Sequence, residues 1–357
     1  MFSATGLVAA FAVLALSVNT VNPSHASPPG VPAGSPYTVD AGGTGDFSTI
    51  GEAVAAASDG DTVFVQPGTY TEAIVIDKDI TLAGDGPVDE IIIVAPADPP
   101  EAFMGDRSFT SPNFESYAVL ISGSDALVTG LTFQGVDTSV IVEGGSPNLR
   151  DLVFDGAGRP FSGTEGEPGQ YELVITSGSS AHIADNTMIG GAGITVGDRS
   201  NPIIEGNSIR GAGDSGIQAA SAISHHPTIR DNDISGVRFG IQMSGGMPGG
   251  KAHEAGGMPV ISGNDVSAEL VGISLGESDA VVYDNTVRDS LNGIVLSGGG
   301  SAEVMGNTVE VTGYGIDIGV YASPIVDGNT VCGGTVSIKV HDTANPKIGE
   351  NTTCEAA

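Results

Sequence analysis

Four ionisable residues occupy one face of a strand that recurs in neighbouring repeats of the sequence. A guanidinium can neutralise a carboxylate on a ligand, and an imidazole near a carboxylate can transfer protons. We therefore take them as candidate catalytic residues. The alternative is an ion-paired stripe, in which Glu205 binds Arg230 one repeat away. The candidates are Arg150, His182, Glu205 and Arg230.

A second candidate site is a set of metal ligands. Two histidines extend the turn before one repeat, and a His-Glu pair extends the same turn in the next repeat. Imidazole nitrogen suits copper and other transition metals, so these side chains could converge on a metal ion. A solvated loop is the favoured alternative, because no spacing matches a compact metal motif. The residues are His225, His226, His253 and Glu254.

A third set points outward from another predicted strand and would suit a carbohydrate. Aromatic faces with a polar edge can pack against sugar rings, while amides and carboxylates accept and donate hydrogen bonds. An ordinary strand surface is the alternative. The candidate substrate-binding residues are Phe239, Tyr314, Gln218, Gln242, Asn292 and Asp317.

The elements that must position these residues follow from a repeat of about 22 residues. Each repeat centres on an asparagine, with apolar residues three before and two after it, and a Gly-Ile pair follows about eight residues later. Spacings of two between apolar residues indicate strands, and a repeat this short has no room for a helix. The asparagines are Asn186, Asn207, Asn232, Asn264, Asn285, Asn307, Asn329 and Asn351.

One such coil cannot bury its own apolar side, so the coils must stack, each strand pairing with its copy in the next coil. The sequence therefore predicts an all-β solenoid, a parallel β-helix. Its asparagines face inward at a turn, where each amide donates to one neighbouring coil and accepts from the other. We also expect these asparagines to tolerate a left-handed backbone there. This role is structural and leaves the asparagine column no part in catalysis.

Two cysteines test this register. Cys332 and Cys354 each follow an asparagine of the column by three residues, which places them in adjacent coils. Neighbouring strands lie about 4.8 Å apart, within the span of a disulfide. We expect a Cys332–Cys354 bond that joins the last coil to the one before it.

The composition limits the partners. The chain has 357 residues and a formal net charge of −31, from 43 acidic and 12 basic side chains. This charge argues against nucleic acid as a partner. It would also repel a polyuronate or a sulfated polymer unless cations such as Ca²⁺ bridged the two.

The N-terminal residues resemble an export signal. A short apolar run from Leu7 to Val18 precedes a small-x-small sequence, so we expect a signal peptide over residues 1–26 and a Pro/Gly/Ser linker over 27–36. No basic residue precedes the run. The run is too short to span a membrane, and no other segment could anchor the chain in lipid. We expect a secreted or extracytoplasmic protein, which agrees with a disulfide.

Residues 37–357 are expected to form one domain, with an N-terminal cap over 37–60. Thr49 and Glu52 have the spacing of a helix capping box, and the residues after Thr49 predict a short helix from Ile50 to Ala57. Such a helix would close the open end of the solenoid.

This cap resembles the start of pectin methylesterases and related secreted β-helix proteins. The matching residues are Gly45-Asp46-Phe47, the helix at Ile50, Gly68-x-Tyr70-x-Glu72 and the run from Ile80 to Gly86. The asparagine repeats resemble those of pectin-lyase-like proteins. The resemblance implies a right-handed helix and, within that fold class, lyase chemistry in which Arg or Lys neutralises a uronate.

The esterase motifs are not reproduced. Segments 151–156 and 158–161 echo two of them, but they lie close together, and the Gln-Asp-Thr motif is missing. We expect a protein that acts on or binds a polysaccharide or cell-surface glycan, either a Ca²⁺-assisted lyase or a glycoside hydrolase. The alternatives are a non-catalytic adhesion solenoid and a periplasmic copper-handling protein. Loops that interrupt the period, at 97–115, 157–170 and 246–257, are further places for function.

Overall fold

The computed structural model describes residues 36–96, 117–134, 138–156, 171–197, 199–211, 213–220, 226–244 and 258–354. All of them belong to one compact unit, Gly34–Ala357. The expected signal peptide lies outside the described residues. So do most of the linker and the three loops that interrupt the period.

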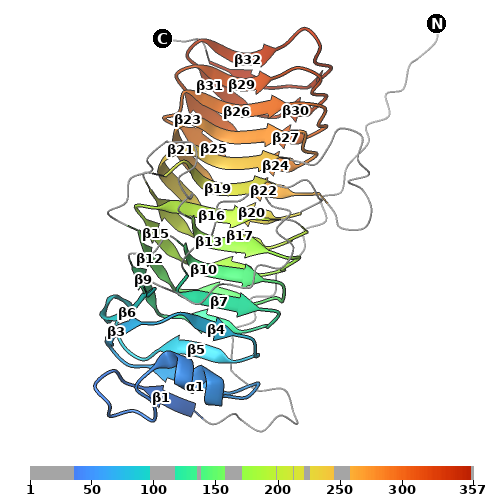
Figure 1. The fold of residues 1–357 in the computed structure, drawn as a ribbon. Coiled ribbons are helices and arrows are strands. Elements are labelled where there is room, and N and C mark those ends of the chain that lie inside the picture. Colours follow the sequence, from blue (N-terminus) through green and yellow to red (C-terminus); the bar gives the residue numbers. More distant parts are fainter. Residues whose placement is uncertain are drawn as a thin grey trace, which may run out of the picture. The chain divides into compact units, whose positions relative to one another are not determined.

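Each coil contributes one strand to a parallel sheet of 13 strands, which we call the first sheet (Figure 1). Its strands precede the asparagine turns. In order they are β1 (Pro36–Val39), β2 (Thr62–Val65), β5 (Thr81–Gly84), β8 (Leu127–Thr129), β11 (Asn148–Arg150), β14 (His182–Ala184), β17 (Ile203–Glu205), β20 (Thr228–Arg230), β22 (Val260–Ser262), β24 (Val281–Tyr283), β27 (Glu303–Met305), β30 (Ile325–Asp327) and β33 (Lys347–Ile348).

A second sheet of 21 strands holds two parallel ladders. The post-asparagine ladder comprises β3 (Gly68–Thr71), β6 (Ile91–Val94), β9 (Thr132–Gln134), β12 (Val153–Asp155), β15 (Thr187–Ile189), β18 (Ser208–Arg210), β21 (Asp233–Ser244), β23 (Asp265–Gly276), β25 (Thr286–Arg288), β28 (Thr308–Val311), β31 (Thr330–Gly333) and β34 (Thr352–Thr353).

The other ladder contains the Gly-Ile pairs, and we call it the glycine ladder. It comprises β4 (Ile74–Ile76), β7 (Val119–Ser122), β10 (Thr138–Glu143), β13 (Tyr171–Thr176), β16 (Ala192–Val196), β19 (Ser215–Ala220), the second halves of β21 and β23, β26 (Asn292–Ser297), β29 (Tyr314–Ile318) and β32 (Val336–Val340). The two ladders meet in β21 and β23, which run through the corner without a break. The predicted parallel β-helix is confirmed.

The core is a set of inward columns that continue from coil to coil. Ile204 and Ile209, three before and two after an asparagine, are buried, and so are their equivalents around every asparagine from Asn186 to Asn329. The Gly-Ile pair has a packing reason. A Cβ at Gly293 would overlap Val309 of the next coil, so at this coil the corner has room only for glycine.

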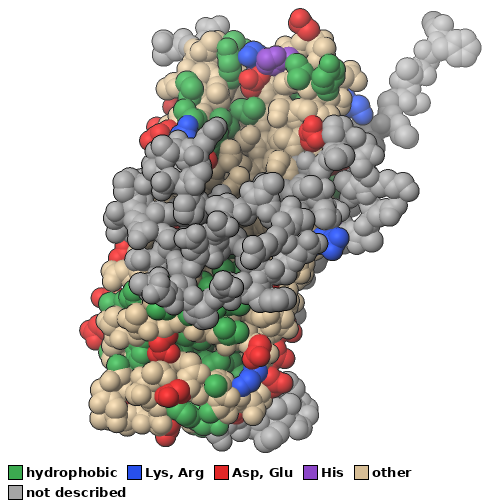
Figure 2. All heavy atoms as spheres, in the orientation of Figure 1, with side chains coloured by type: hydrophobic (Ala, Val, Ile, Leu, Met, Phe, Trp, Pro, Cys, Tyr) green, Lys and Arg blue, Asp and Glu red, His purple; other side chains and the backbone are tan. Residues whose placement is uncertain are grey.

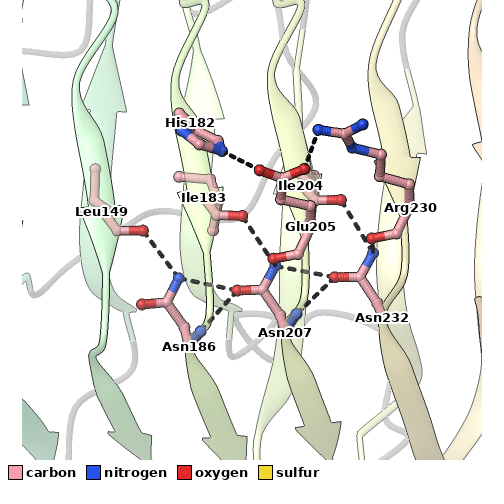
Figure 3. Close-up of polar contacts among 9 residues, drawn as sticks. All are labelled: Leu149, His182, Ile183, Asn186, Ile204, Glu205, Asn207, Arg230 and Asn232. Carbon is pink, nitrogen blue, oxygen red and sulfur yellow. Dashed lines mark hydrogen bonds and ion pairs between the residues drawn. The ribbon is translucent and has the colours of Figure 1, made fainter. Parts of the chain in front are cut away.

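The asparagine column forms a continuous ladder of side-chain amides (Figure 3). Asn207 Nδ2 donates to the Ile183 carbonyl and to Asn232 Oδ1, each at 3.0 Å, and its backbone N donates to the same Oδ1 at 3.0 Å. The structural role is thereby confirmed. One detail differs. The left-handed residue is the one before each asparagine, such as Asp185 at φ 55° or Gly206 at φ 66°, and no asparagine is left-handed in the described part.

The helix α1 (Ile50–Ala56) closes the N-terminal end and ends one residue before the predicted position (Figure 1). Thr49 Oγ1 accepts from the backbone N of Glu52 at 3.3 Å, which is the predicted N-cap contact. A 3₁₀ turn, η1 (Val88–Glu90), is the other helical element among the described residues.

Two charged side chains from the following coil also hold α1, and no sequence motif predicts these contacts. The Glu72 carboxylate accepts from the backbone N of Ile50 and Gly51, at 2.9 and 2.8 Å. Lys78 Nζ donates to three carbonyls at the C-terminal end of the helix, those of residues 54, 55 and 57, at 2.8–3.0 Å. The acid lies at the positive end of the helix and the base at its negative end.

The predicted disulfide is present. Cys332, in β31, is bonded to Cys354, which directly follows β34, with a Cα–Cα distance of 4.7 Å. Within the described residues, no helix has the length and apolar character that a membrane span requires.

Candidate functional site

The first sheet brings three of the four candidate catalytic residues together (Figure 3). Strands β14, β17 and β20 carry His182, Glu205 and Arg230 in successive coils. His182 Nε2 lies 2.7 Å from Glu205 Oε1, and an Arg230 amino group pairs with Glu205 Oε2. Both carboxylate oxygens are therefore occupied. This is the geometry of the ion-paired stripe.

The electrostatics follow from this geometry. Burial alone would raise the pKa of Glu205, but His182 and Arg230 outweigh it and hold the pKa below its ordinary value. The carboxylate is ionised and already has two partners, so it is a weak proton acceptor. Arg150 does not join the group. Arg150 pairs in register with Ala184 and Ala184 with Glu205, so Arg150 lies two coils before Glu205. Its guanidinium lies 3.6 Å from Asp151.

Of the four proposed metal ligands the structure describes His226, while His225, His253 and Glu254 lie outside the described residues. The Nδ1 atom of His226 is buried without a hydrogen-bond partner, and burial lowers the pKa of the imidazole. Within the described residues, no group of three or more His, Cys, Asp or Glu side chains could hold a metal ion.

The proposed substrate-binding residues fall into two columns of the glycine ladder. Gln218, Gln242 and Asp317 belong to one column that runs along the solenoid through β19, β21, β23, β26 and β29. Gln242 Oε1 accepts a hydrogen bond from Ser215 at 2.6 Å. All three are partly exposed, so this column presents polar groups over several coils.

Phe239, Asn292 and Tyr314 lie in the neighbouring column. The Arg238 guanidinium lies 5.7 Å from the centre of the Phe239 ring. Asn292 Oδ1 accepts from the backbone N of Tyr314 at 3.1 Å. Asn292 therefore helps to fix β29 as well as facing outward.

Four ionisable side chains lie close together at the C-terminal end of the glycine ladder. We call them the terminal cluster: Tyr314, Asp317, Lys339 and His341. Asp317 Oδ1 lies 3.0 Å from His341 Nε2, and its Oδ2 lies 3.6 Å from Lys339 Nζ. The same ammonium lies 4.0 Å from the centre of the Tyr314 ring. Figure 2 shows basic, acidic and histidine side chains together at this end of the face, over β29 and β32.

Sequence reasoning found half of the terminal cluster and missed Lys339 and His341. Both depend on β32, whose repeat has Ser337-Ile338 where the six repeats before it, from Gly193-Ile194 to Gly315-Ile316, have Gly-Ile. Ile338 is level with Ile316, and Lys339 is level with Asp317. Extending the register by one coil despite the missing glycine would have found both residues.

A buried carboxyl was also missed. Glu172 takes the corner position that glycine occupies in the later coils and is only 4% exposed. Its Oε2 accepts from Ser139 Oγ at 2.8 Å, and its other oxygen fills space left by Gly156 and Gly191. Burial raises the pKa of Glu172 to about 7, an effect that the Ser139 hydrogen bond reduces and nearby Asp155 increases.

Comparisons with known proteins agree with this architecture. Residues 117–253 match the description of a right-handed β-helix region, and residues 247–356 match that of a periplasmic copper-binding protein, NosD. A comparison with curated protein sequences finds no match. The chain is a right-handed parallel β-helix. The handedness expected from the family resemblance is thereby confirmed.

Several solved structures resemble this β-helix at low sequence identity. The periplasmic alginate epimerase AlgG is 13% identical, with a TM-score of 0.51 over 82% of this chain and 77% of that one. An alginate lyase from a Paenibacillus species is 16% identical, with a TM-score of 0.43 over 84% and 96% of the two chains. A Thermotoga maritima exopolygalacturonase is 12% identical, with a TM-score of 0.46 over 82% and 84%. At such identities the likeness concerns the fold alone.

Proposed function

We propose that this protein is an extracytoplasmic polysaccharide-active protein that binds an acidic polymer along the glycine ladder and acts on it at the terminal cluster. The observation that carries the proposal is the contact of Asp317 with both Lys339 and His341, with Tyr314 beside the ammonium. The disulfide and the match to a periplasmic protein support the location.

The shape of the face suits a linear polymer. The column from Gln218 to Asp317 crosses five coils, and neighbouring strands lie about 4.8 Å apart, so the column runs about 19 Å along the solenoid. It begins with neutral amides and ends at the charged cluster. A sugar chain lying along it would meet hydrogen-bonding groups first and ionisable groups at one end.

The chemistry of the terminal cluster suits a uronate. The Lys339 ammonium would neutralise the sugar carboxylate and so make the hydrogen on the adjacent carbon more acidic. Tyr314 and His341 are the groups that would accept and return that proton, with Asp317 holding Lys339 and His341 in place. Return to the opposite face inverts the carbon. Expulsion of the neighbouring glycosidic oxygen, which then takes a proton, leaves an unsaturated sugar.

The negative charge of the chain opposes the binding of an acidic polymer. The net charge of −31 disfavours the approach of a polyanion at low salt. At the terminal cluster the Lys339 ammonium offsets the Asp317 carboxylate. We propose that dissolved Ca²⁺ helps by bridging carboxylates of the polymer and the surface, and the experiment below includes it for that reason.

The test is turnover and binding with a panel of alginate, polygalacturonate and neutral polysaccharides, with Ca²⁺ and with chelator. Ultraviolet absorbance would report unsaturated uronates, reducing ends would report hydrolysis, and proton exchange with heavy water would report inversion. Lys339→Ala is expected to lose at least tenfold in activity. Lys347→Ala is the matched control, because it removes an equal charge from β33 on the other sheet.

The same assay compares the two candidate sites. Arg230→Ala should leave activity within about twofold, since its guanidinium is committed to Glu205. Loss of activity in Arg230→Ala with none in Lys339→Ala would move the site to His182, Glu205 and Arg230. Binding without turnover would favour the adhesion solenoid. Neither binding nor turnover with any polysaccharide of the panel would contradict the proposal.

A copper-handling role is the second candidate, because residues 247–356 match a periplasmic copper-binding protein and the unpaired His226 Nδ1 lies just before β20. We propose that copper would bind His226 together with His225, His253 and Glu254. Metal analysis after mild dialysis tests this directly. Copper retained by the wild type and lost in His226→Ala would support it, whereas equal copper in both would contradict it.

A further inference from the structure

The terminal cluster is divided between two coils of unequal support. Tyr314 and Asp317 belong to β29, which pairs with β26 on one side and β32 on the other. Lys339 lies in β32 and His341 directly after Val340, the last residue of that strand. The pairing described for β32 is with β29, so half of the cluster stands on an edge strand.

The coil that carries β32 buries little apolar surface. Val336 and Val340 are 40% and 44% exposed, and Ile348 in β33 is 48% exposed. In the preceding coil, Ile316 and Ile318 are fully buried. Packing therefore holds the terminal coil far less firmly than it holds the coils inside the stack.

The disulfide joins the ends of this same coil. Cys332 lies in β31 and Cys354 follows β34, so the closed loop contains β32 and β33. Ser337 Oγ, within β32, donates to the Cys354 carbonyl at 3.3 Å. This hydrogen bond links the disulfide-bonded C-terminal segment to the strand that carries Lys339. Closing such a loop removes open conformations of the chain that lies between the two cysteines.

We infer that the Cys332–Cys354 bond is a positioning element of the terminal cluster: it keeps β32 on β29, and so holds Lys339 and His341 against Asp317. The functional part of this inference rests on the proposed function. Its structural part, the ordering of β32 by the bond, does not. The bond thereby makes the cluster sensitive to reduction. Two electrons and two protons from dithiothreitol convert the bond into two thiols, while the reagent closes to its cyclic disulfide.

The first measurement is hydrogen exchange of the oxidised and reduced protein without any polysaccharide. The backbone N of His341 donates to the Ile318 carbonyl at 3.0 Å and should be protected in the oxidised protein. Reduction is expected to speed exchange over residues 336–354 at least tenfold and to leave β26 unchanged. Equal exchange in both states would overturn the inference, whatever the protein binds.

The second measurement is affinity for alginate and polygalacturonate, in a cycle that crosses reduction with Lys339→Ala. Reduction should weaken binding at least fivefold, and by no less than Lys339→Ala does, because it releases both Lys339 and His341. In the reduced protein Lys339→Ala should weaken binding no further, because the Lys339 contact is already lost. Factors that multiply would overturn the positioning role. Lys347→Ala, in the same coil but outside the cluster, is the charge control.

Two further experiments distinguish failure of the positioning role from failure of the proposed function. Cys332→Ser/Cys354→Ser should reproduce the reduced protein, and reoxidation of the wild type should restore both protection and affinity. Affinity that stays lost after protection has returned would overturn the positioning role. If the oxidised protein binds neither polymer, the proposed function fails, while the exchange result still decides whether the bond orders β32.

Discussion

The coils inside the stack and the last coil use the same repeat with different consequences. An inner coil has a neighbour on each side, so its asparagine, its isoleucines and its strand edges are all satisfied. The last coil keeps the same positions, but Ile338 and Asn351 are only partly buried. The same residue type therefore contributes different amounts of stability, and the terminal coil gains a covalent bond where packing is weak.

The largest expected difference is at the asparagines. The Asn285 side chain donates to the carbonyls of residues 261 and 283 and to Asn307 Oδ1, and it accepts twice from Asn264. Asn285→Ala leaves buried groups without partners in two coils and should cost about 4 kcal/mol of unfolding free energy. Asn351→Ala, where water can replace the amide, should cost about 1 kcal/mol. Urea unfolding measures both, and equal losses would contradict the comparison.

The isoleucines of the glycine ladder sharpen the same contrast. Ile316 is fully buried, whereas Ile338, one coil later in the same column, is only partly so. Ile316→Ala should cost about 3 kcal/mol, and Ile338→Ala about half as much, because its site can admit water instead of leaving a cavity. Thermal unfolding of the two variants, with Val340→Ala as an exposed control, would show the ranking.

Glu172 tests what happens when an inner coil breaks its own pattern. Its folded pKa of about 7 lies above its ordinary value of 4.5, so its protonated form is favoured in the folded state. The stability linked to that proton is present at pH 4 and is lost as pH rises through about 7. Glu172→Gln should therefore match the wild type near pH 4 and exceed it by up to about 3 kcal/mol at pH 8.

Unfolding free energies of both proteins measured at several pH values provide the check. A constant difference between them from pH 4 to pH 8 would mean that Glu172 does not titrate in this range. Ser139→Ala removes the hydrogen bond that lowers the pKa of Glu172, and it should move the loss to higher pH.

The smallest effect concerns the other end of the solenoid, which a helix closes instead of a disulfide. Glu72→Ala removes the acceptor for two backbone N–H groups at the start of α1 and should cost about 1 kcal/mol. Glu52→Ala should cost less, because its side chain has no hydrogen bond described to the helix. Exchange at Ile50 and Gly51 reports the local change, and similar rates in both variants would argue against the Glu72 cap.

The regular part of the molecule could be predicted from the sequence because a single rule governs it. A period of about 22 residues, apolar spacings of two and a recurring inward amide permit only stacked parallel coils. The disulfide followed from the same register. Prediction failed where the rule was broken: Ser337 in place of glycine concealed β32, and Glu172 occupies a corner that the pattern reserves for glycine.

The candidate site divides in the same way. The pattern placed Tyr314, Asp317 and Glu205 on outward faces, since strand alternation fixes which side chains leave the core. It could not rank one face above another, because ion pairing depends on how long side chains meet across coils. In the structure Glu205 pairs with His182 and Arg230, and Asp317 pairs with Lys339 and His341.

The sequence by itself determined the stacking, the inward columns and the cysteine pairing, because each depends on a backbone repeat that reads the same in every coil. Only the tertiary structure decided which ionisable groups touch, how α1 is held by Glu72 and Lys78, and that Glu172 is buried. Those outcomes depend on distances between side chains from different coils, which a one-dimensional period does not specify.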